Sequence, residues 1–207
     1  IKKINFSYYY LGGAKVDFNF NKEKPTNKLN CLFAGQFGHN YDVELILETA
    51  LLLKENKINT VSFYLAGDGL KMKSMKNFIK VNNLDNVKLL GWLNSEELMN
   101  AASYCHVGLN TYKLAATQSI PTKIFDYMSM GLYVLNSLKE EASSLVEKEL
   151  KGSNYEPENI DDFYKEIIKL QTNIKSITVK GYESQVYFTE KYTFEKIYKK
   201  MIDNLIK

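Results

Sequence analysis

The chain has 207 residues, of which 45% are hydrophobic and 25% charged, and these proportions are typical of a globular protein with a sizeable core. The formal net charge of +3 is too small to indicate nucleic-acid binding. No apolar run is long enough to span a membrane and no signal peptide opens the chain, so we expect a cytoplasmic protein. The chain begins at Ile1 rather than Met, which favours a fragment of a longer protein.

The sulfur and imidazole side chains do not indicate a metal site. Cys31 and Cys105 lie in apolar, strand-like runs, so we expect both to be buried and reduced. The two histidines, His39 and His106, are far apart in the sequence, and no Cys/His cluster has the spacing of zinc ligands. A nucleophile elbow and a Ser/His/Asp set are also missing from the sequence.

Residues 1–27 do not fit the pattern of the rest of the chain. Residues 4–11 are predicted as a strand that a glycine pair stops, and residues 16–20 alternate like a short edge strand. Residues 21–27 are polar and indicate a linker. One interpretation of the whole segment is a β-ribbon packed on the edge of a domain.

From Leu29 onward, short apolar runs alternate with amphipathic stretches. The runs expected as buried strands are residues 29–34, 61–66, 87–90, 105–109 and 132–135. The stretches with helical periodicity include residues 43–53, 118–131, 142–146, 159–170 and 192–206. We expect Asn94 with Glu97, and Thr193, to cap two helices. This alternation predicts an α/β fold in which helices cover both faces of a Rossmann-like parallel sheet.

Glycine-bearing loops follow the first three predicted strands. Gly35 to Gly38 follow the first strand, Gly67 to Gly69 the second, and Gly91 the third. In parallel sheets ligands bind at the carboxyl ends of the strands, so these loops are expected to converge on one site. Taken singly, the first loop is better explained as a plain turn, and Asp68 as the cap of the helix that follows.

The stretch that follows the fourth strand carries the strongest signal. Pro121 suits the first turn of a helix, Ser119 stands where it can be the N-cap, and Gly131 fits the C-cap. Lys123 lies one turn into this helix, and Asp126 lies three residues after Lys123 in the same helix. Free helix-start amides beside a lysine and a carboxylate suit an anionic ligand that bears hydroxyl groups. The alternative is an ordinary core helix.

The stretch Gln118-Ser-Ile-Pro-Thr-Lys-Ile-Phe-Asp-Tyr-Met-Ser-Met-Gly131 resembles the donor-binding signature of the family 4 retaining glycosyltransferases, which have the GT-B fold. In that family two glutamates stand eight positions apart, where this chain has Gln118 and Asp126. The stretch is similar to the form found in bacterial enzymes that build O-antigen and capsule glycans. The resemblance runs from about Lys28 to the C-terminus and implies one half of a GT-B fold.

The resemblance implies a role for each candidate residue. Asp126 would bind the ribose of a nucleotide-sugar, and Lys123 with the helix-start amides would steady the leaving diphosphate. Gln118 keeps hydrogen-bonding capacity without the charge of the family's acid, so only its hydrogen bond to the sugar is expected. The remaining residues expected along the donor are Gly38, Gly67, Gly69, Trp92, Leu93, Thr117 and Ser119. Trp92 would lie by the base, although a lone Trp can equally anchor packing.

The function implied is that of a donor-binding domain of a retaining glycosyltransferase. The donor would be a uridine diphosphate sugar and the acceptor a lipid-linked glycan of O-antigen or capsule synthesis, with neither metal nor cofactor required. Acceptor-binding residues belong to an N-terminal domain in the family, so we expect this chain alone to be inactive. The alternatives are another GT-B enzyme, such as a nucleotide-sugar epimerase, and a non-catalytic Rossmann-like binding or assembly module.

The resemblance also divides the chain into parts. Residues 1–27 become the end of an interdomain connection, unless they are the edge ribbon, and residues 28–190 become the nucleotide-sugar-binding domain. Residues 191–207 form a basic amphipathic helix that packs back toward the N-terminal domain. Such a helix can also touch a membrane surface, which would place the protein at the inner face of the cytoplasmic membrane.

Overall fold

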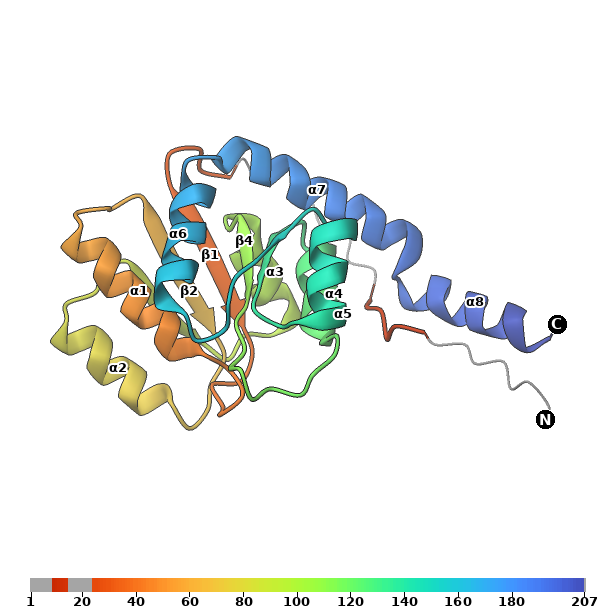
Figure 1. The fold of residues 1–207 in the computed structure, drawn as a ribbon, viewed down its shortest axis with the longest axis horizontal. Coiled ribbons are helices and arrows are strands. Elements are labelled where there is room, and N and C mark those ends of the chain that lie inside the picture. The colour runs from red at the N-terminus through yellow and green to blue at the C-terminus, as the bar shows by residue number, and fades with distance from the viewer. Residues whose placement is uncertain (1–8, 15–23, 207) are drawn as a thin grey trace.

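The computed structural model describes residues 9–14 and 24–206. A six-stranded parallel sheet has the strand order β3-β2-β1-β4-β5-β6 (Figure 1). The strands are β1 (Leu29–Ala34), β2 (Val61–Ala66), β3 (Val87–Gly91), β4 (Val107–Asn110), β5 (Tyr133–Asn136) and β6 (Ser153–Asn154). The order reverses between β1 and β4, and this is the point at which open α/β sheets place their ligands.

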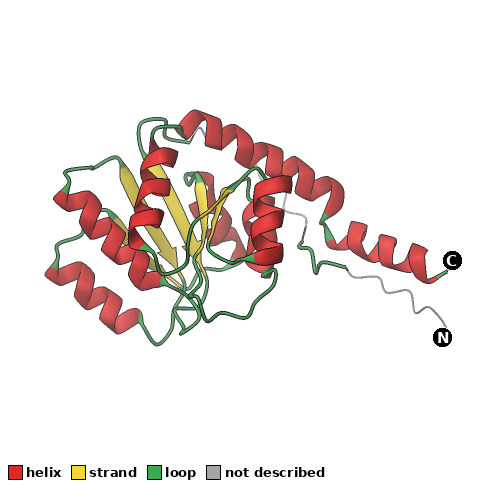
Figure 2. Ribbon diagram, viewed as in Figure 1, coloured by secondary structure: helices red, strands yellow, loops and turns green. Residues whose placement is uncertain are grey.

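Helices cover both faces of this sheet (Figure 2), which confirms the predicted Rossmann-like α/β fold. The helices are α1 (Val43–Glu55), α2 (Met72–Val81), α3 (Ser95–Ser103), α4 (Thr122–Ser129), α5 (Glu140–Ser144), the π-helix η1 (Leu145–Glu149), α6 (Ile160–Gln171), α7 (Ile174–Lys191) and α8 (Phe194–Leu205). Phe33 on β1 packs with α1 and α6 on one face, while Leu32 packs with α3 and α4 on the other. Because β1 is buried on both faces, its sequence is apolar apart from Asn30, whose side-chain amide donates to the carbonyl of Tyr104.

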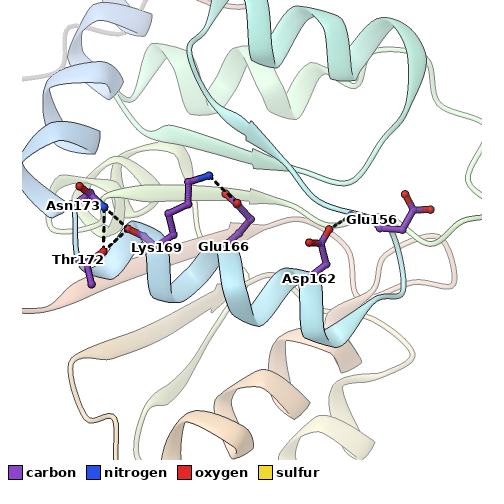
Figure 3. A network of polar contacts seen from close by, with 6 residues as sticks. All are labelled: Glu156, Asp162, Glu166, Lys169, Thr172 and Asn173. Carbon is purple, nitrogen blue, oxygen red and sulfur yellow. Dashed lines mark hydrogen bonds and ion pairs between the residues drawn. The ribbon is translucent and has the colours of Figure 1, made fainter.

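Several local predictions are confirmed. Asn94 and Glu97 form the expected capping box of α3, and Thr193 accepts a hydrogen bond from the amide of Lys196 at the start of α8. The two cysteines are buried and free. At the start of α6, the carboxylate of Asp162 accepts a hydrogen bond from the amide of Glu156 (Figure 3). At its end, the Lys169 ammonium donates to the carboxylate of Glu166, and the carbonyl of Lys169 accepts from the side-chain amide of Asn173.

Two predicted caps are wrong. α4 begins at Thr122, and Pro121 itself is the N-cap with an extended backbone, so Ser119 lies too far upstream to reach the first amides. The Ser119 hydroxyl instead donates to Glu141 at 2.5 Å. Asp68 does not cap α2, which begins at Met72, because its carboxylate turns back to accept from the amide of Gly69 at 2.7 Å.

The helix α7 is a finding that the sequence pattern did not indicate. It packs against α4 and β5, and an added Cβ at Gly181 would lie 2.5 Å from the carbonyl oxygen of Gly131. A glycine within a helix weakens the helical signal, but here it lets two backbones approach closely. Among residues 9–14 and 24–206, no helix combines the length and apolarity needed to cross a membrane.

The N-terminal predictions fall mostly outside the described residues, as does the whole of the predicted edge strand at residues 16–20. Residues 9–11 carry no strand. Gly13 forms a parallel bridge with Thr193: its amide donates to the carbonyl of Tyr192 at 3.0 Å and its carbonyl accepts from the amide of Phe194 at 2.9 Å. The short segment 9–14 therefore lies against the start of α8, which extends away from the sheet (Figure 1).

Candidate ligand site at the carboxyl edge of the sheet

The loops after β1, β2 and β3 are joined by their backbones. The amide of Gly35 donates to the carbonyl of Ala66 at 3.0 Å, and the amide of Gly67 donates to the carbonyl of Gly91 at 2.6 Å. A Cβ added at Gly67 would overlap the carbonyl oxygen of Gly35, and φ at Gly67 is 140°. Only glycine allows this approach. The three loops thus form a floor made of backbone, which leaves room for a ligand above it.

A hollow of about 530 Å³ lies against this floor. Gly67, Trp92, Leu93 and Asp126 are among its lining residues, so four of the predicted site residues meet here. Trp92 is 75% exposed, so the alternative that it anchors packing is wrong and its indole face is available to a ligand.

Two predicted glycines lie beside this hollow rather than in its lining. Gly69 has φ of 151°, and an added Cβ would lie 2.8 Å from the backbone oxygen of Phe37. The carbonyl of Gly38 accepts from the amide of Tyr41 at 3.4 Å, in the manner of a turn. Both glycines shape the loops behind the floor.

A second hollow of about 310 Å³ shares Gly35 and Asp126 with the first. Lys123 on α4 projects beneath it and is only 8% exposed. Its ammonium lies 3.9 Å from the ring centroid of Tyr41 and 4.0 Å from that of Phe33, and it has no hydrogen-bond partner among the described residues. Burial lowers the pKa of Lys123 to about 7, although the nearby carboxylate of Asp126 acts to raise it.

The start of α4 borders the same hollow. Pro121 supplies no side-chain cap, and within the described part of the chain the amides of Thr122 and Lys123 donate no hydrogen bond. Helix N-termini carry a partial positive charge from such unpaired amides. Thr122 and Lys123 line the same hollow, and an anion with several oxygen acceptors there would offer partners to both the unpaired amides and the unpaired ammonium.

Asp126 stands at the exposed rim between the two hollows. Desolvation by the surrounding protein raises the pKa of its carboxyl, and the positive charge of Lys123 partly offsets this. A carboxylate at the rim accepts hydrogen bonds only, which suits a partner that bears hydroxyl groups.

Thr117, Gln118 and Ser119 lie apart from the other predicted site residues. They line a third hollow of about 300 Å³, together with Lys113 and Lys139 among others. The structure therefore brings Lys123 and Asp126 together with the glycine floor, but it places the beginning of the signature stretch in a neighbouring depression.

Sequence reasoning missed the aromatic residues around Lys123. Tyr41 ends the glycine loop and Tyr112 follows β4, and their rings lie 4.7 Å apart between centroids. With fifteen tyrosines in the chain, no feature of the sequence distinguishes these two. Within the described ranges, no group of three or more His, Cys, Asp or Glu side chains could hold a metal ion.

Comparison with known proteins gives a family match. Residues 28–173, well over half of the chain, match the family model described as "Glycosyl transferases group 1". Among curated proteins, none matches this sequence.

Several solved structures share the fold. A TarM mutant from S. aureus, in complex with UDP, α-GlcNAc-glycerol and fondaparinux, has a TM-score of 0.72 and 22% identity, covering 91% of this chain and 37% of TarM. HepE from Anabaena, in complex with UDP and glucose, has a TM-score of 0.74 and 18% identity, covering 95% of this chain and 56% of HepE. The catalytic domain of the Helicobacter pylori cholesterol-α-glucosyltransferase has a TM-score of 0.64 and 16% identity, covering 78% of this chain and 98% of that domain. This chain thus spans about a third to a half of TarM and HepE.

Proposed function

The chain belongs to the glycosyl transferases group 1 family, which has the GT-B fold, and we propose that it is the donor-binding domain of a retaining enzyme that uses a uridine diphosphate sugar. The observation that carries this proposal is the buried ammonium of Lys123, which lacks a hydrogen-bond partner among the described residues and belongs to a residue that lines the same hollow as the start of α4. A diphosphate offers both groups the acceptors that they lack.

Each part of the donor has a place in this proposal. The diphosphate lies over the glycine floor at the start of α4, and the carboxylate of Asp126 accepts hydrogen bonds from the ribose hydroxyls. The base lies in the larger hollow beside Trp92 and Leu93, with Gly67 in the floor below. The sugar extends toward Thr117, Gln118 and Ser119 in the third hollow. Gly38 and Gly69 act indirectly, by shaping the loops that carry the floor.

The chemistry in this proposal is electrostatic. When the bond between the anomeric carbon and the phosphate oxygen breaks, negative charge accumulates on the leaving diphosphate. The ammonium of Lys123 and the amides of α4 stabilise that charge in a partly dehydrated site, and Gln118 holds the sugar by hydrogen bonding. Because these groups supply positive charge themselves, the proposed reaction uses neither a metal ion nor another cofactor.

The acceptor is assigned to a separate N-terminal domain and is proposed to be a lipid-linked glycan of a bacterial surface polysaccharide, O-antigen or capsule. The side chains of Phe194, Tyr198 and Ile202 on α8, with Ile206 directly after it, are exposed and recur every four residues as an apolar stripe. We assign residues 28–190 to donor binding and residues 191–207 to packing against that domain, which this stripe supports. In this proposal the enzyme works in the cytoplasm at the inner face of the membrane.

Calorimetric titration with UDP tests the proposal. We expect the wild-type chain to bind UDP and Asp126→Ala to bind at least ten times more weakly, with circular dichroism unchanged. The matched control is Asp85→Ala. Asp85 is an exposed aspartate that precedes β3, so it lies at the amino ends of the strands and away from the proposed site. Equal affinity of the wild type and Asp126→Ala would refute the assignment of the ribose, and no binding by the wild type would refute the uridine donor.

A non-catalytic binding module is the second candidate, and the observation that favours it is Gln118, which cannot supply charge where the family's signature has an acid. Transfer assays on the full-length gene product discriminate the two. Donor binding without turnover or donor hydrolysis would favour the module.

A further inference from the structure

The environment of the Lys123 ammonium is made almost entirely of aromatic rings. Its Nζ atom lies 4.0 Å from the ring centroid of Phe33, 3.9 Å from that of Tyr41 and 5.7 Å from that of Tyr112. A cation over a ring face is attracted by the ring quadrupole, and this attraction grows when water is excluded. These three rings, which we call the aromatic cage, attract the ammonium in the ligand-free protein, as does the carboxylate of Asp126.

The cage is assembled from three separate parts of the fold. Phe33 lies on β1, Tyr41 at the end of the following loop and Tyr112 beyond β4. Tyr41 and Tyr112 form an antiparallel bridge, and the hydroxyl of Tyr112 donates to that of Tyr41 at 3.2 Å. Phe33 meets Tyr41 edge to face, at 5.6 Å between centroids. The backbone of both loops thus holds the rings in place independently of Lys123.

Gly35 lies beside the ammonium and leaves it the space that a side chain at this position would occupy. A Cβ at this position would lie 2.7 Å from Nζ, so a side chain there would displace the ammonium. Lys123 is therefore held between ring faces on one side and the backbone floor on the other. Lys123 is also one of the residues that line the hollow with Gly35, Thr122 and Asp126.

We propose that Tyr41 and Phe33 are positioning residues of the donor site, which hold the Lys123 ammonium dehydrated beneath Gly35 so that the donor diphosphate becomes its first hydrogen-bonding partner. This inference rests on the proposed function, because it assigns the diphosphate to that hollow. The inference goes beyond the proposed function because it assigns a role to two aromatic side chains, of which Tyr41 also lines the hollow.

The cage has a consequence for proton binding. Burial lowers the pKa of Lys123 to about 7, so the lysine is only partly protonated near neutral pH, and an anion bound beside it favours the protonated form. Donor binding then takes up a proton, and affinity falls as the pH rises. The other titratable groups around Lys123 are Asp126, Tyr112 and Tyr127 together with Tyr41. The pKa values of Tyr112 and Tyr127 are raised by burial, so these two phenols stay neutral below pH 8.

The test uses UDP-glucose rather than UDP, because a terminal phosphate has a pKa near 6 and would itself titrate in the range of interest. For the wild type, linkage to a group with a pKa of about 7 predicts a dissociation constant about ten times larger at pH 8 than at pH 6. Tyr41→Leu frees Lys123 to reach water or Asp126. We expect this variant to bind about fivefold more weakly at pH 6 and to lose most of the pH dependence.

Tyr41→Phe is the matched control, because it keeps the ring face and removes only the hydroxyl. It should retain both the affinity and the pH dependence of the wild type. The same slope and affinity in Tyr41→Leu as in the wild type would overturn the positioning role, even if UDP-glucose binds well. Absence of binding by the wild type at every pH would overturn the proposed function and the positioning role with it.

Nuclear magnetic resonance on the ligand-free wild type examines the cage without relying on the donor or on a variant that folds. With lysine labelled at the ε-carbon, the Lys123 signal should be shifted by the ring currents of Phe33 and Tyr41 and should titrate near pH 7. Addition of UDP-glucose should raise the midpoint. A Lys123 signal without a ring-current shift, titrating like an ordinary lysine, would refute the cage.

Discussion

The two edges of the sheet each bury a nitrogen base, and they treat it in opposite ways. At the amino edge, before β4, His106 is 1% exposed, its Nδ1 accepts from the amide of Asn30 at 3.1 Å and its Nε2 lies 2.8 Å from the carbonyl of Pro25. At the carboxyl edge, Lys123 is 8% exposed and lacks a hydrogen-bond partner among the described residues. Buried polar groups in folded proteins are normally paired, so a buried nitrogen without a partner is a candidate for ligand binding. The paired base joins chain segments, and the unpaired one belongs to the proposed donor site.

The hydrogen bonds of His106 also define its charge. Because Nδ1 accepts, Nε2 must carry the hydrogen and donate to Pro25, and a second proton on Nδ1 would face the amide of Asn30. Burial and the nearby charge of Lys24 lower the pKa of His106 to about 4. Lys24 itself is partly buried and donates to the carbonyl of Gly131 at 3.2 Å, so this lysine is paired as well.

The contrast between His106 and Lys123 would not hold if His106 were dispensable for stability. We expect His106→Ala to lower the free energy of unfolding by about 3–5 kcal/mol, because it leaves a cavity and two unpaired backbone groups. Its affinity for UDP-glucose should stay within twofold of the wild type. Urea denaturation and calorimetry measure the two effects, and a loss of affinity without a loss of stability would reverse the assignment of the edges.

The dependence of stability on pH is a second test of the role of His106. In the unfolded chain His106 has the ordinary pKa of about 6.5, so between pH 6.5 and 4 the unfolded state binds more protons than the folded state. Stability from this group is complete above pH 6.5 and is lost as the pH falls to 4, by about 3 kcal/mol at most. Urea denaturation at several pH values checks this. A His106→Gln variant, which cannot titrate, should show a smaller loss over the same range.

The matching change at the carboxyl edge is Lys123→Met. This variant keeps the apolar stem but removes the ammonium, so we expect about a hundredfold loss of UDP-glucose affinity. Replacing a buried unpaired charge by an apolar side chain should also leave stability unchanged or raise it, by up to about 4 kcal/mol. A marked drop in the unfolding temperature would mean that Lys123 serves the fold, and the contrast between the edges would disappear.

The smallest effect is expected at Gln118. Because this residue lines the third hollow, Gln118→Ala should change the affinity for UDP by less than about threefold, within the range of one exposed hydrogen bond. A larger loss for the sugar donor than for UDP would place the sugar beside Gln118. Equal losses for both ligands would place the nucleotide there instead and would extend the site along the whole edge.

The elements that follow from local sequence patterns were predicted correctly, and those that depend on contacts between distant parts of the chain were missed. The strand at 29–34 and the capping box at Asn94 follow from local patterns that need no tertiary information. The cap expected at Ser119 failed because the chain stays extended through Pro121, where a helical start was expected. The helix α7 escaped because Gly181 looks like a break until its contact with the backbone of Gly131 is known.

For the site, the sequence identified residue types but not their environment. Lys123 and Asp126 were found from the spacing of the signature, and the structure places them around one pair of hollows. The isolation of Lys123 from any hydrogen-bond partner could not be read from the sequence, because Phe33, Tyr41 and Tyr112 are separated from it by up to ninety positions. Unpaired groups are a property of tertiary packing, and local patterns do not report them.

The contact between Gly35 and Gly67 limits how this protein can be re-engineered. A side chain at Gly67 would overlap the carbonyl oxygen of Gly35 and push the two loops apart, and a side chain at Gly35 would strain a backbone with φ of 155° and displace the Lys123 ammonium. Directed evolution toward a different base or sugar would therefore have to act through the rim, at positions such as Trp92 or Gln118. We expect libraries randomised at the rim to yield folded proteins with altered ligand choice, and libraries randomised at the two glycines to yield mostly unfolded chains.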